Sequence, residues 1–320
     1  MRKFALLTSG GDAPGMNAAI RSVTRSLLFY ENEVIGIRRG YEGLLDEDFL
    51  PMSRSSVGGI LLHGGTILKT ARSPQFMCEE GINKAVENLK KYDIDGLVVI
   101  GGDGTFRGAE ELHNRGVSVI GIPATIDNDI FGTDATIGFD TACNTALECI
   151  SKLRDTASSH ERMFIVEVMG RDSGFLALET GVACGAEYVV LPEKDFNIND
   201  LCDKVNISKL KGKTHSIVVL AEGAMSANEL RDILKKNNCV YTPKVVVLGY
   251  LQRGGVPTCF DTVLASKLGV NAVTLLLADK SGLMVGIDGG KVVSMPMELA
   301  RSNTKKLNKD MLTLIDILSI

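Results

Sequence analysis

Short apolar runs alternate with segments of helical periodicity along this chain, and that alternation limits the fold more than any other feature. Apart from Glu167, the runs are apolar without alternation, which is typical of strands that are buried on both faces. They lie at residues 4–7, 97–100, 119–122, 164–168, 217–220 and 245–248. Helical spacing appears between them at Met16, Ile20, Val23 and Leu27, and over 142–153 and 228–236. The pattern predicts an α/β fold with mostly parallel sheets covered by helices on both faces.

Length and charge exclude some classes of protein and leave the domain boundary open. A chain of 320 residues allows two domains. No repeat, low-complexity tract or Pro-rich linker marks a boundary between them. The net charge of −4 gives no electrostatic reason to expect nucleic acid or an acidic membrane as the main partner.

The cysteines and the apolar stretches indicate a compartment. The seven cysteines are scattered and contain no C-x-x-C pair, which disfavours a disulfide framework and a zinc site and indicates a reducing compartment. The first apolar run stops at Thr8, too early for a signal peptide. No apolar stretch approaches the roughly 20 residues that span a bilayer. We therefore expect a cytoplasmic protein.

Four glycine-rich loops share one layout, in which an apolar strand precedes the loop and a helix follows it. They lie at 9–15, 101–105, 169–172 and 252–255, and the last two carry an arginine. Ligands of open α/β sheets bind at the carboxyl ends of strands, and helix N-termini offer free N–H groups to phosphates. One such loop would be read as a turn, whereas four favour phosphate binding. The first loop matches neither G-x-G-x-x-G nor the P-loop, so glycine amides and other cations would hold a nucleotide.

Carboxylates and arginines near these loops supply candidate chemistry. Asp127 and Asp129 are two apart, so an extended chain would point both in one direction, as a base beside a metal requires. Taken alone, they are better explained by an Asx-rich turn that caps a helix. Asp103 stands between glycines, where it can reach Mg²⁺ or serve as a turn residue. Candidate phosphate ligands are Arg72, Arg162, Arg171 and Arg253, although a solvated surface charge is the better explanation for any one of them alone.

Six motifs together resemble those of the ATP-dependent 6-phosphofructokinase family. They are LLTSGGDAPGMNAAIR (6–21), GGDGT (101–105), ATIDNDI (124–130), SSHER (158–162), VEVMGR (166–171) and LQRGG (251–255). Their order and spacing match the family from about residue 1 to 300. GGDGT alone also occurs in NAD and lipid kinases, so the combination makes the resemblance specific.

The resemblance implies a fold and an activity. The fold would be two doubly wound α/β domains with mostly parallel sheets and the active site in the cleft between them. The ATP-binding domain would be 1–138 plus 251–304, and the sugar-phosphate-binding domain 139–250 plus 305–320. The enzyme would be a homotetramer that phosphorylates fructose 6-phosphate at the 1-hydroxyl with ATP and Mg²⁺. The products would be fructose 1,6-bisphosphate and ADP, in the committing step of glycolysis.

The resemblance also implies binding residues for the two substrates. ATP would contact Gly11, Tyr41, Arg72, Ser73, Gly102, Asp103, Gly104 and Thr105, with Mg²⁺ on Asp103. The sugar phosphate would contact Thr125, Ile126, Asp127, Arg162, Met169, Gly170, Arg171, Glu222, Lys244, Tyr250, Leu251, Gln252 and Arg253. Two of these, Arg162 and Lys244, would reach the 6-phosphate from a neighbouring subunit.

The catalytic roles follow from the same resemblance. Asp127 would take the proton of the sugar 1-hydroxyl, and Arg171 and Arg72 would stabilise charge on the transferring phosphoryl group. Thr125 and the Gly11 amide would position that group. Asp129 would support the metal side. This division suits a reaction that needs alignment and charge neutralisation more than covalent chemistry.

An effector site is implied as well. In the family it lies between subunits and binds ADP as activator or phosphoenolpyruvate as inhibitor. The matching residues are Arg21, Arg25, Arg54, Arg154, Gly185, Glu187, Lys211, Lys213 and His215.

Three positions depart from the family pattern. Lys244 and Tyr250 stand where the family usually has arginine and histidine, and both serve the sugar end. Lysine lacks the bidentate fork of arginine. Gly59 replaces an aspartate that helps to hold the effector's metal. Affinity for fructose 6-phosphate and activation by nucleotide are therefore the properties that these changes put in question.

Three alternatives stay open. The pyrophosphate-dependent branch typically has aspartate at 104 and lysine at 124, whereas Gly104 and Ala124 are small and favour ATP. A second alternative is a kinase of a different sugar phosphate. A third is a regulatory paralogue that binds ligands and assembles with an active subunit. Four residues argue against it, namely Asp103, Asp127, Asp129 and Arg171.

Overall fold

The chain folds into two compact units. The computed structural model describes residues 1–237, 239, 241 and 243–318. Unit 1 comprises Met1–Ile126, Ile130–Thr141 and Arg253–Lys305. Unit 2 comprises Asp127–Asp129, Ala142–Gln252 and the residues from Lys306 onward.

The short segment Asp127–Asp129 groups with unit 2, whereas the sequence prediction placed it with the N-terminal part of the chain. The hydroxyl Oγ of Ser173, in unit 2, donates a hydrogen bond to the Asp127 carbonyl at 3.2 Å. This contact holds the segment to unit 2. Which ligand each unit binds stays a prediction.

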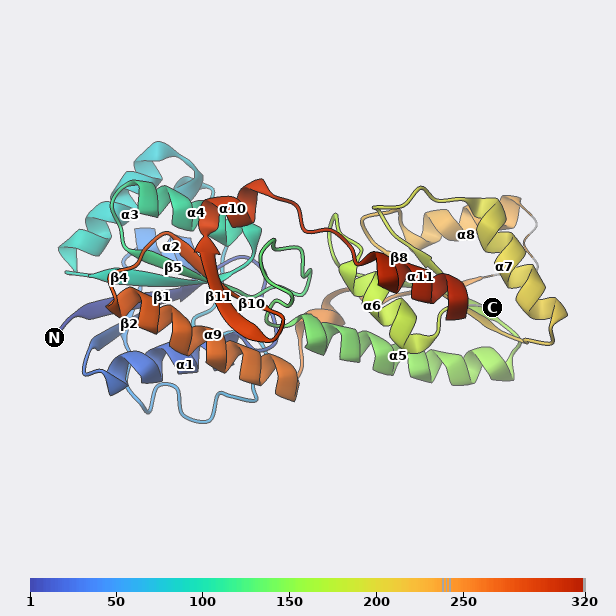
Figure 1. Cartoon of the computed structure of the whole chain (residues 1–320), viewed down its shortest axis with the longest axis horizontal. Coiled ribbons are helices and arrows are strands. Elements are labelled where there is room, and N and C mark those ends of the chain that lie inside the picture. The colour runs from blue at the N-terminus through green and yellow to red at the C-terminus, as the bar shows by residue number, and fades with distance from the viewer. Residues whose placement is uncertain (238, 240, 242, 319–320) are drawn as a thin grey trace. The chain divides into compact units, whose positions relative to one another are not determined.

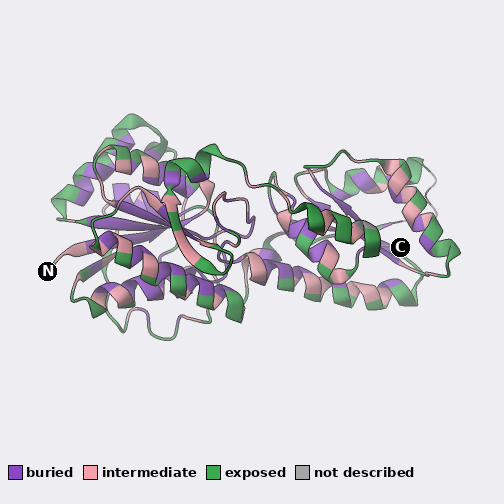
Figure 2. Cartoon of the chain, in the orientation of Figure 1, coloured by how far each residue is buried: buried purple, intermediate pink, exposed green. Residues whose placement is uncertain are grey.

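Unit 1 is built on a seven-stranded sheet with the order β11-β10-β5-β4-β1-β2-β3 (Figure 1). The inner neighbours pair in parallel, and β3 and β11 pair antiparallel at the two edges. Figure 2 shows that the central strands are buried. The strands are β1 (Lys3–Thr8), β2 (Glu33–Ile37), β3 (Phe49–Pro51), β4 (Gly96–Gly101), β5 (Val119–Pro123), β10 (Leu283–Asp288) and β11 (Lys291–Pro296).

Helices cover both faces of this sheet (Figure 1). Helices α1 and α9 lie on one face, and α2, α3, α4 and α10 lie on the other, where they pack on a common core with Leu7 and Val99. The helices are α1 (Met16–Phe29), α2 (Gly40–Leu45), α3 (Glu79–Lys91), α4 (Asp103–Asn114), α9 (Cys259–Leu277) and α10 (Met297–Ser302), with the 3₁₀ helix η1 (Gln75–Met77). The four apolar positions predicted at helical spacing from Met16 to Leu27 are all buried in α1.

Helix α9 differs from the expectation that no apolar stretch approaches a bilayer-spanning length. Among the described residues it is the one helix long and apolar enough, with 19 residues and a mean hydropathy of 1.4. It packs along α1, where the Ser22 hydroxyl donates to the Ser266 carbonyl at 2.7 Å. Core helices of folded domains pass the same test of length and composition, so α9 is weak support for a membrane span.

Unit 2 has a four-stranded, fully parallel sheet with the order β7-β8-β6-β9. Its strands are β6 (Met163–Val168), β7 (Tyr188–Val190), β8 (Ser216–Ala221) and β9 (Lys244–Val247). Its helices are α5 (Phe139–Ser159), which begins in unit 1, α6 (Phe175–Cys184), α7 (Ile198–Leu210), α8 (Ala227–Lys236) and α11 (Lys309–Leu318), with the 3₁₀ helix η2 (Gly249–Arg253). Helices α7 and α8 share a core with β6 and β8, and α5 and α6 cover the other face (Figure 1).

The predicted fold class is confirmed, because both sheets are mostly parallel and both are covered by helices. Each of the six predicted strands lies within one residue of an observed strand's limits. One detail of the loops differs from the prediction. The loop at 252–255 does not follow a strand directly, since η2 (Gly249–Arg253) comes after β9 and includes the loop's first two residues.

Candidate active site

The loops after β1 and β4 lie against each other in unit 1. The Ser9 amide donates to the Ile100 carbonyl at 3.0 Å, and the Thr105 hydroxyl donates to the Ser9 carbonyl at 3.0 Å. A Cβ on Gly101 would lie 2.4 Å from the Ser9 carbonyl oxygen, so no larger residue fits there. The close approach joins the two glycine loops into one backbone surface at the carboxyl ends of neighbouring parallel strands.

Asp103 begins α4 at the edge of this surface. Its Oδ2 pairs with Nη2 of Arg107, one helical turn away, at 2.8 Å, and its side chain is 36% exposed. A Cβ on the next residue, Gly104, would meet no atom within 4 Å, so the space beside the start of α4 is open. The described residues contain no cluster of three His, Cys, Asp or Glu placed to hold a metal. One accessible carboxylate fits Mg²⁺, which often takes its remaining ligands from phosphates and water.

Tyr41 supports the same loop from inside unit 1. Its ring stacks on Phe76 with the centroids 4.1 Å apart, and its hydroxyl donates to the Thr105 carbonyl at 2.5 Å. Burial raises the pKa of the Tyr41 phenol, so it stays a neutral donor. A direct contact of Tyr41 with a nucleotide stays a prediction.

The predicted nucleotide residues Gly11 and Arg72 are exposed, and Ser73 is partly exposed. A Cβ on Gly11 would lie 3.4 Å from the guanidinium carbon of Arg253. Arg253, which was predicted to contact the sugar phosphate, therefore lies beside Gly11 within unit 1.

Thr125 follows β5 and adjoins the loop after β4. A Cβ on Gly102 would lie 3.4 Å from the Thr125 Cβ, and the Ala124 amide donates to the Gly101 carbonyl at 2.9 Å. The neighbouring Ile126 is buried. The structure thus places Thr125 next to the loop that carries Asp103.

Asp127 and Arg171 face each other in unit 2. Nε of Arg171 lies 3.9 Å from Oδ2 of Asp127, and the side chains are 59% and 12% exposed. Glu222 fixes the arginine's backbone, because its Oε1 accepts from the Arg171 amide at 2.9 Å. Arg171 lies in the loop after β6 and has a φ of 53°, which is a left-handed conformation. Non-glycine residues seldom adopt this conformation, and such residues occur often at functional sites.

Asp127 and Asp129 do not share one direction in an extended chain. The prediction rested on an extended segment, but Asn128 between them has a φ of 53°. A left-handed residue reverses the local chain direction, and Asn adopts this conformation more readily than most residues. The premise was therefore wrong, while the role of Asp129 beside a metal stays a prediction.

Gln252 is buried behind the loop that precedes Arg171. It has no exposed surface, and its Oε1 accepts from the Met169 amide at 2.9 Å. The next residue of the loop, Gly170, has a φ of 137°, and a Cβ there would lie 2.6 Å from the Ser173 carbonyl oxygen. The amide side chain of Gln252 holds this loop from behind through its oxygen, and its predicted contact with the sugar stays a prediction.

Other predicted sugar residues lie at two ends of the unit 2 sheet. Arg162 precedes β6, and Lys244 begins β9 in register with Phe164, so both are at the amino ends of neighbouring strands. Both are exposed, as are Tyr250 at 78% and Leu251 at 65%. Met169, Gly170 and Arg171 follow the carboxyl end of β6 instead.

The predicted effector residues of unit 2 form a cluster. The fully buried Glu187 accepts a hydrogen bond from Lys213 and one from the Ile217 amide, and Nη2 of Arg154 donates to the Cys184 carbonyl at 2.5 Å. Gly185 ends α6 with a φ of 62°. Both ring nitrogens of His215 are buried without a hydrogen-bond partner, and burial followed by the charge of Arg154 lowers its pKa.

The remaining predicted effector residues lie elsewhere. Lys211 is exposed at the end of α7. In unit 1, Arg21 and Arg25 are one turn apart on α1, and Arg54 is exposed in the loop after β3.

Sequence reasoning overlooked Asp261, in the first turn of α9. It has no exposed surface, and burial raises the pKa of its carboxyl. A local signal was present, since Thr258 stands three residues before it at the start of an apolar helix, and the Thr258 side chain accepts from the Asp261 amide. That signal predicts a helix start only, because the other partners of Asp261 are about 120 residues away in the sequence.

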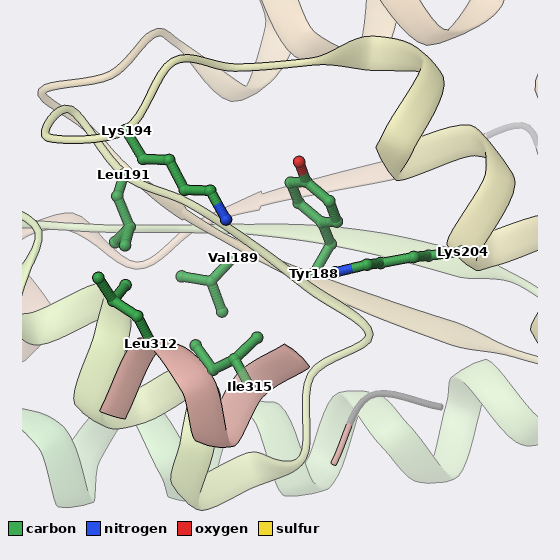
Figure 3. Close-up of a pocket in the computed structure, with 7 residues that line it drawn as sticks. All are labelled: Tyr188, Val189, Leu191, Lys194, Lys204, Leu312 and Ile315. Carbon is green, nitrogen blue, oxygen red and sulfur yellow. The ribbon is translucent and has the colours of Figure 1, made fainter. Parts of the chain in front are cut away.

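A small pocket in unit 2 includes none of the predicted site residues (Figure 3). Its lining residues are Tyr188, Val189, Leu191, Lys194, Lys204, Leu312 and Ile315. The last two come from α11, and the ammonium group of Lys204 lies 5.3 Å from the centre of the Tyr188 ring. The pocket is a gap where α11 packs beside β7.

The comparisons with known proteins identify a family. Residues 3–276 match the family described as Phosphofructokinase. Two bacterial proteins named ATP-dependent 6-phosphofructokinase cover 100% of both chains, one from Listeria welshimeri serovar 6b at 52% identity and one from Clostridioides difficile (strain 630) at 53%.

Solved structures agree at the level of the fold. Phosphofructokinase from Saccharomyces cerevisiae matches 100% of this chain and 47% of its own, with a TM-score of 0.88 and 35% identity, so this chain spans about half of it. A pyrophosphate-dependent phosphofructokinase from Nitrosospira multiformis has a TM-score of 0.87 at 20% identity over 92% of its length and 100% of this chain, which shows the fold alone.

The resemblance inferred from six motifs is therefore confirmed along the chain. The family match spans most of the 320 residues and includes all six of those motifs in full. Identity above 50% over the full length of bacterial relatives excludes a match limited to one loop. The chain belongs to the phosphofructokinase family.

Proposed function

We propose that this chain is an ATP-dependent 6-phosphofructokinase, which transfers the γ-phosphoryl group of ATP to the 1-hydroxyl of fructose 6-phosphate. The observation that carries the proposal is the pair formed by Asp127 and Arg171, with a 3.9 Å separation between a largely buried carboxylate oxygen and an exposed guanidinium. A base with a cation beside it suits phosphoryl transfer to a hydroxyl group. The name of the relatives at 52% and 53% identity supports the same activity.

Asp127 acts as the general base in this mechanism. It takes the proton of the 1-hydroxyl as the sugar oxygen bonds to the γ-phosphorus. The bond from that phosphorus to the oxygen bridging to the β-phosphorus breaks, and ADP leaves. Arg171 and Arg72 neutralise charge on the transferring group, while Thr125 and the Gly11 amide align it.

Asp103 would hold Mg²⁺ together with phosphate oxygens. When bound, the ion neutralises charge on the β- and γ-phosphates. In this structure Oδ2 of Asp103 pairs with Arg107, and this ion pair would open if the same oxygen were to bind the metal. An exposed pair of this kind contributes little to stability, and its opening costs correspondingly little.

The donor can be tested at residue 104. Gly104 and Ala124 leave space for the nucleotide, so we expect turnover with ATP and none with pyrophosphate. Gly104→Asp should reduce turnover with ATP, because a carboxylate there repels the phosphates. Gly104→Ala is the matched control, since a Cβ at this position meets no atom within 4 Å. Comparable turnover of the unmodified protein with pyrophosphate would overturn the choice of donor.

The acceptor can be tested by a coupled assay of ADP formation with a panel of phosphorylated ketoses. We expect the largest kcat/KM with fructose 6-phosphate. A larger value for another ketose would change the substrate, and no turnover with any of them would favour a regulatory paralogue.

We further infer that the enzyme is a cytoplasmic homotetramer in which neighbouring copies complete each sugar site. Arg162 and Lys244 lie at the amino end of the unit 2 sheet, whereas Arg171 lies past the carboxyl end. Strand β6 has 6 residues and spans roughly 20 Å, too far for one sugar phosphate to touch both ends.

Mixing two inactive variants tests this arrangement. Asp127→Ser and Arg162→Ala should each be inactive alone and regain part of the activity in mixed oligomers. Some sites then contain an intact Asp127 from one subunit and an intact Arg162 from its neighbour. Light scattering gives the mass of the assembly, and cell fractionation gives its location. No recovery in oligomers proven to be mixed would contradict shared sites.

A further inference from the structure

Asp261 ties the start of one helix to another in unit 1. Its Oδ1 accepts from the Gly138 amide at 2.9 Å. Its Oδ2 accepts from the Thr141 amide at 2.8 Å and from the Thr141 hydroxyl at 2.6 Å. These groups lie at the beginning of α5, whose first amides have no partner within the helix. A buried side chain of α9 thus caps α5.

The segment just before α5 is tied to the end of β5. The Thr136 hydroxyl donates to the Thr125 carbonyl at 2.6 Å. The Ile137 amide donates to the Pro123 carbonyl at 3.1 Å, and Ile137 forms a parallel bridge with Ala124. The position of Thr125 therefore depends on that of residues 136–138.

The same segment also packs against the loop after β1. A Cβ on Gly138 would lie 2.7 Å from the Ala13 Cβ, and a Cβ on Gly15 would lie 2.7 Å from Cγ2 of Ile137. Contacts this close leave no free volume between the two segments. A shift of residues 136–138 would therefore move both Thr125 and the loop that carries Gly11.

We propose that Asp261 is a positioning residue for phosphoryl transfer. It touches neither substrate in this proposal, and it acts by holding residues 136–138, which in turn set the places of Thr125 and the Gly11 loop. The inference rests on the proposed kinase activity. Transfer between oxygens depends on alignment, and a misplacement of about 1 Å can cost about 100-fold in rate.

Asp261→Asn tests the proposal with little change of shape. An asparagine keeps one acceptor oxygen and replaces the other with a donor, so the Gly138 or the Thr141 amide loses its acceptor. We expect kcat to fall about 10-fold to 100-fold with fructose 6-phosphate, with the KM for ATP changed less than about twofold. Hydrogen exchange at the amides of residues 138 and 141 should become faster.

Thr136→Val tests the last link by itself. It removes the hydroxyl bonded to the Thr125 carbonyl and leaves the Asp261 bonds in place. We expect kcat to fall about 10-fold, with hydrogen exchange at residues 138 and 141 unchanged. If Asp261→Asn does not fold, this variant alone tests whether residues 136–138 position Thr125, and an unchanged kcat would then contradict the proposal.

Val273→Ala is the matched control for lost stability. Val273 is fully buried in the same helix and belongs to no predicted site. We expect a lower melting temperature and a kcat within about twofold of the unmodified enzyme.

The outcomes separate the two proposals. A large fall in kcat for Asp261→Asn and Thr136→Val, with none for Val273→Ala, supports positioning. If Asp261→Asn lowers the melting temperature and keeps kcat within about twofold, Asp261 is structural only and the inference is wrong. If the unmodified enzyme does not turn over fructose 6-phosphate, the proposed function itself fails.

Discussion

Single side chains around the candidate site divide into those that face solvent and those that hold loops from behind. Arg171, Arg72 and Asp103 are accessible to a ligand. Gln252 and Tyr41 are buried and bond to the backbone of the loops that carry the accessible groups. The exposed set would perform the chemistry, and the buried set would keep it in place.

Asp127→Ser tests the general base. Serine removes the carboxylate and keeps a small polar group, so we expect kcat to fall about 10²–10⁴-fold with ATP binding nearly unchanged. Steady-state kinetics and calorimetric titration of ATP measure the two effects. Asp172→Asn is the matched control, because Asp172 is an exposed neighbour of Arg171 outside the predicted site. A normal kcat for Asp127→Ser would contradict its role as base.

The 6-phosphate pocket can be tested at Lys244 and Tyr250. A phosphate dianion prefers charge-assisted donors, and arginine offers two from one rigid plane. Lysine gives a single direct contact, and tyrosine cannot become cationic as histidine can. We expect Lys244→Arg combined with Tyr250→His to lower the KM for fructose 6-phosphate about tenfold, with little change in the KM for ATP.

The measurement is a pair of saturation curves for the unmodified and doubly changed enzymes. Each single substitution serves as a control for the other. An unchanged or higher KM for the sugar would mean that the pocket is already matched to its ligand, and that ligand should then be sought among other phosphorylated ketoses.

Whole elements were predictable from the sequence where local pattern decides them. Strands β1, β4 and β5 each contain an apolar run, which is followed by Thr8, Gly101 and Pro123 respectively, and they lie within one residue of their predicted limits. Motif residues such as Asp103 and Thr125 were also identified from the sequence. Local pattern could not reveal the left-handed Asn128, the 3₁₀ helix η2 or the bonds of Asp261, because tertiary contacts decide these features.

Helix α8 offers a test of local stability. Its N-terminus carries a capping box, in which the Ser226 side chain accepts from the Glu229 amide and the Glu229 side chain accepts from the Ser226 amide. Ser226→Ala should destabilise the helix by about 1 kcal/mol. The Glu229 amide loses its acceptor, and the reciprocal bond from the Glu229 side chain becomes less well ordered. Hydrogen exchange in the first turn of α8 and urea unfolding measure the loss.

Helix α7 provides the comparison for α8. There the Asn197 side chain accepts from the amides of Asn199 and Asp200, without a reciprocal acid. Asn197→Ala should cost a similar amount in α7 and leave exchange in α8 unchanged. Equal exchange in α8 before and after Ser226→Ala would show that the capping box does not stabilise it.

At the scale of the whole molecule, predicted effector residues occur on both units. Unit 1 contributes Arg21, Arg25 and Arg54, and unit 2 contributes Arg154, Lys211, Lys213, Glu187, Gly185 and His215. The unit 2 set contains a hydrogen-bonded cluster, in which Glu187 already engages Lys213. An anionic effector would compete with Glu187 for that cation, so its binding must supply enough free energy to rearrange the pair.

Gly59→Asp tests how strongly nucleotide activation depends on a missing carboxylate. Gly59 has a φ of 72°, and a Cβ there would meet no atom within 4 Å, so the new side chain has room. Aspartate adopts left-handed conformations more readily than most residues, which limits the strain. We expect ADP to lower the sugar concentration at half-saturation more in Gly59→Asp than in the unmodified enzyme, with a coupling of about 1–3 kcal/mol. The test titrates ADP and phosphoenolpyruvate against the sugar saturation curve.

Gly59→Asn separates charge from backbone strain in that experiment. It has the same size and the same left-handed backbone requirement, but it carries no charge and holds a divalent cation less well. Stronger activation by ADP in Gly59→Asp alone would identify the carboxylate as the missing element, and by reciprocity fructose 6-phosphate should tighten ADP binding by the same factor. Equal responses of both variants and the unmodified enzyme would place control of activation elsewhere, and no response to either ligand in any of them would mean that the predicted effector site is not functional.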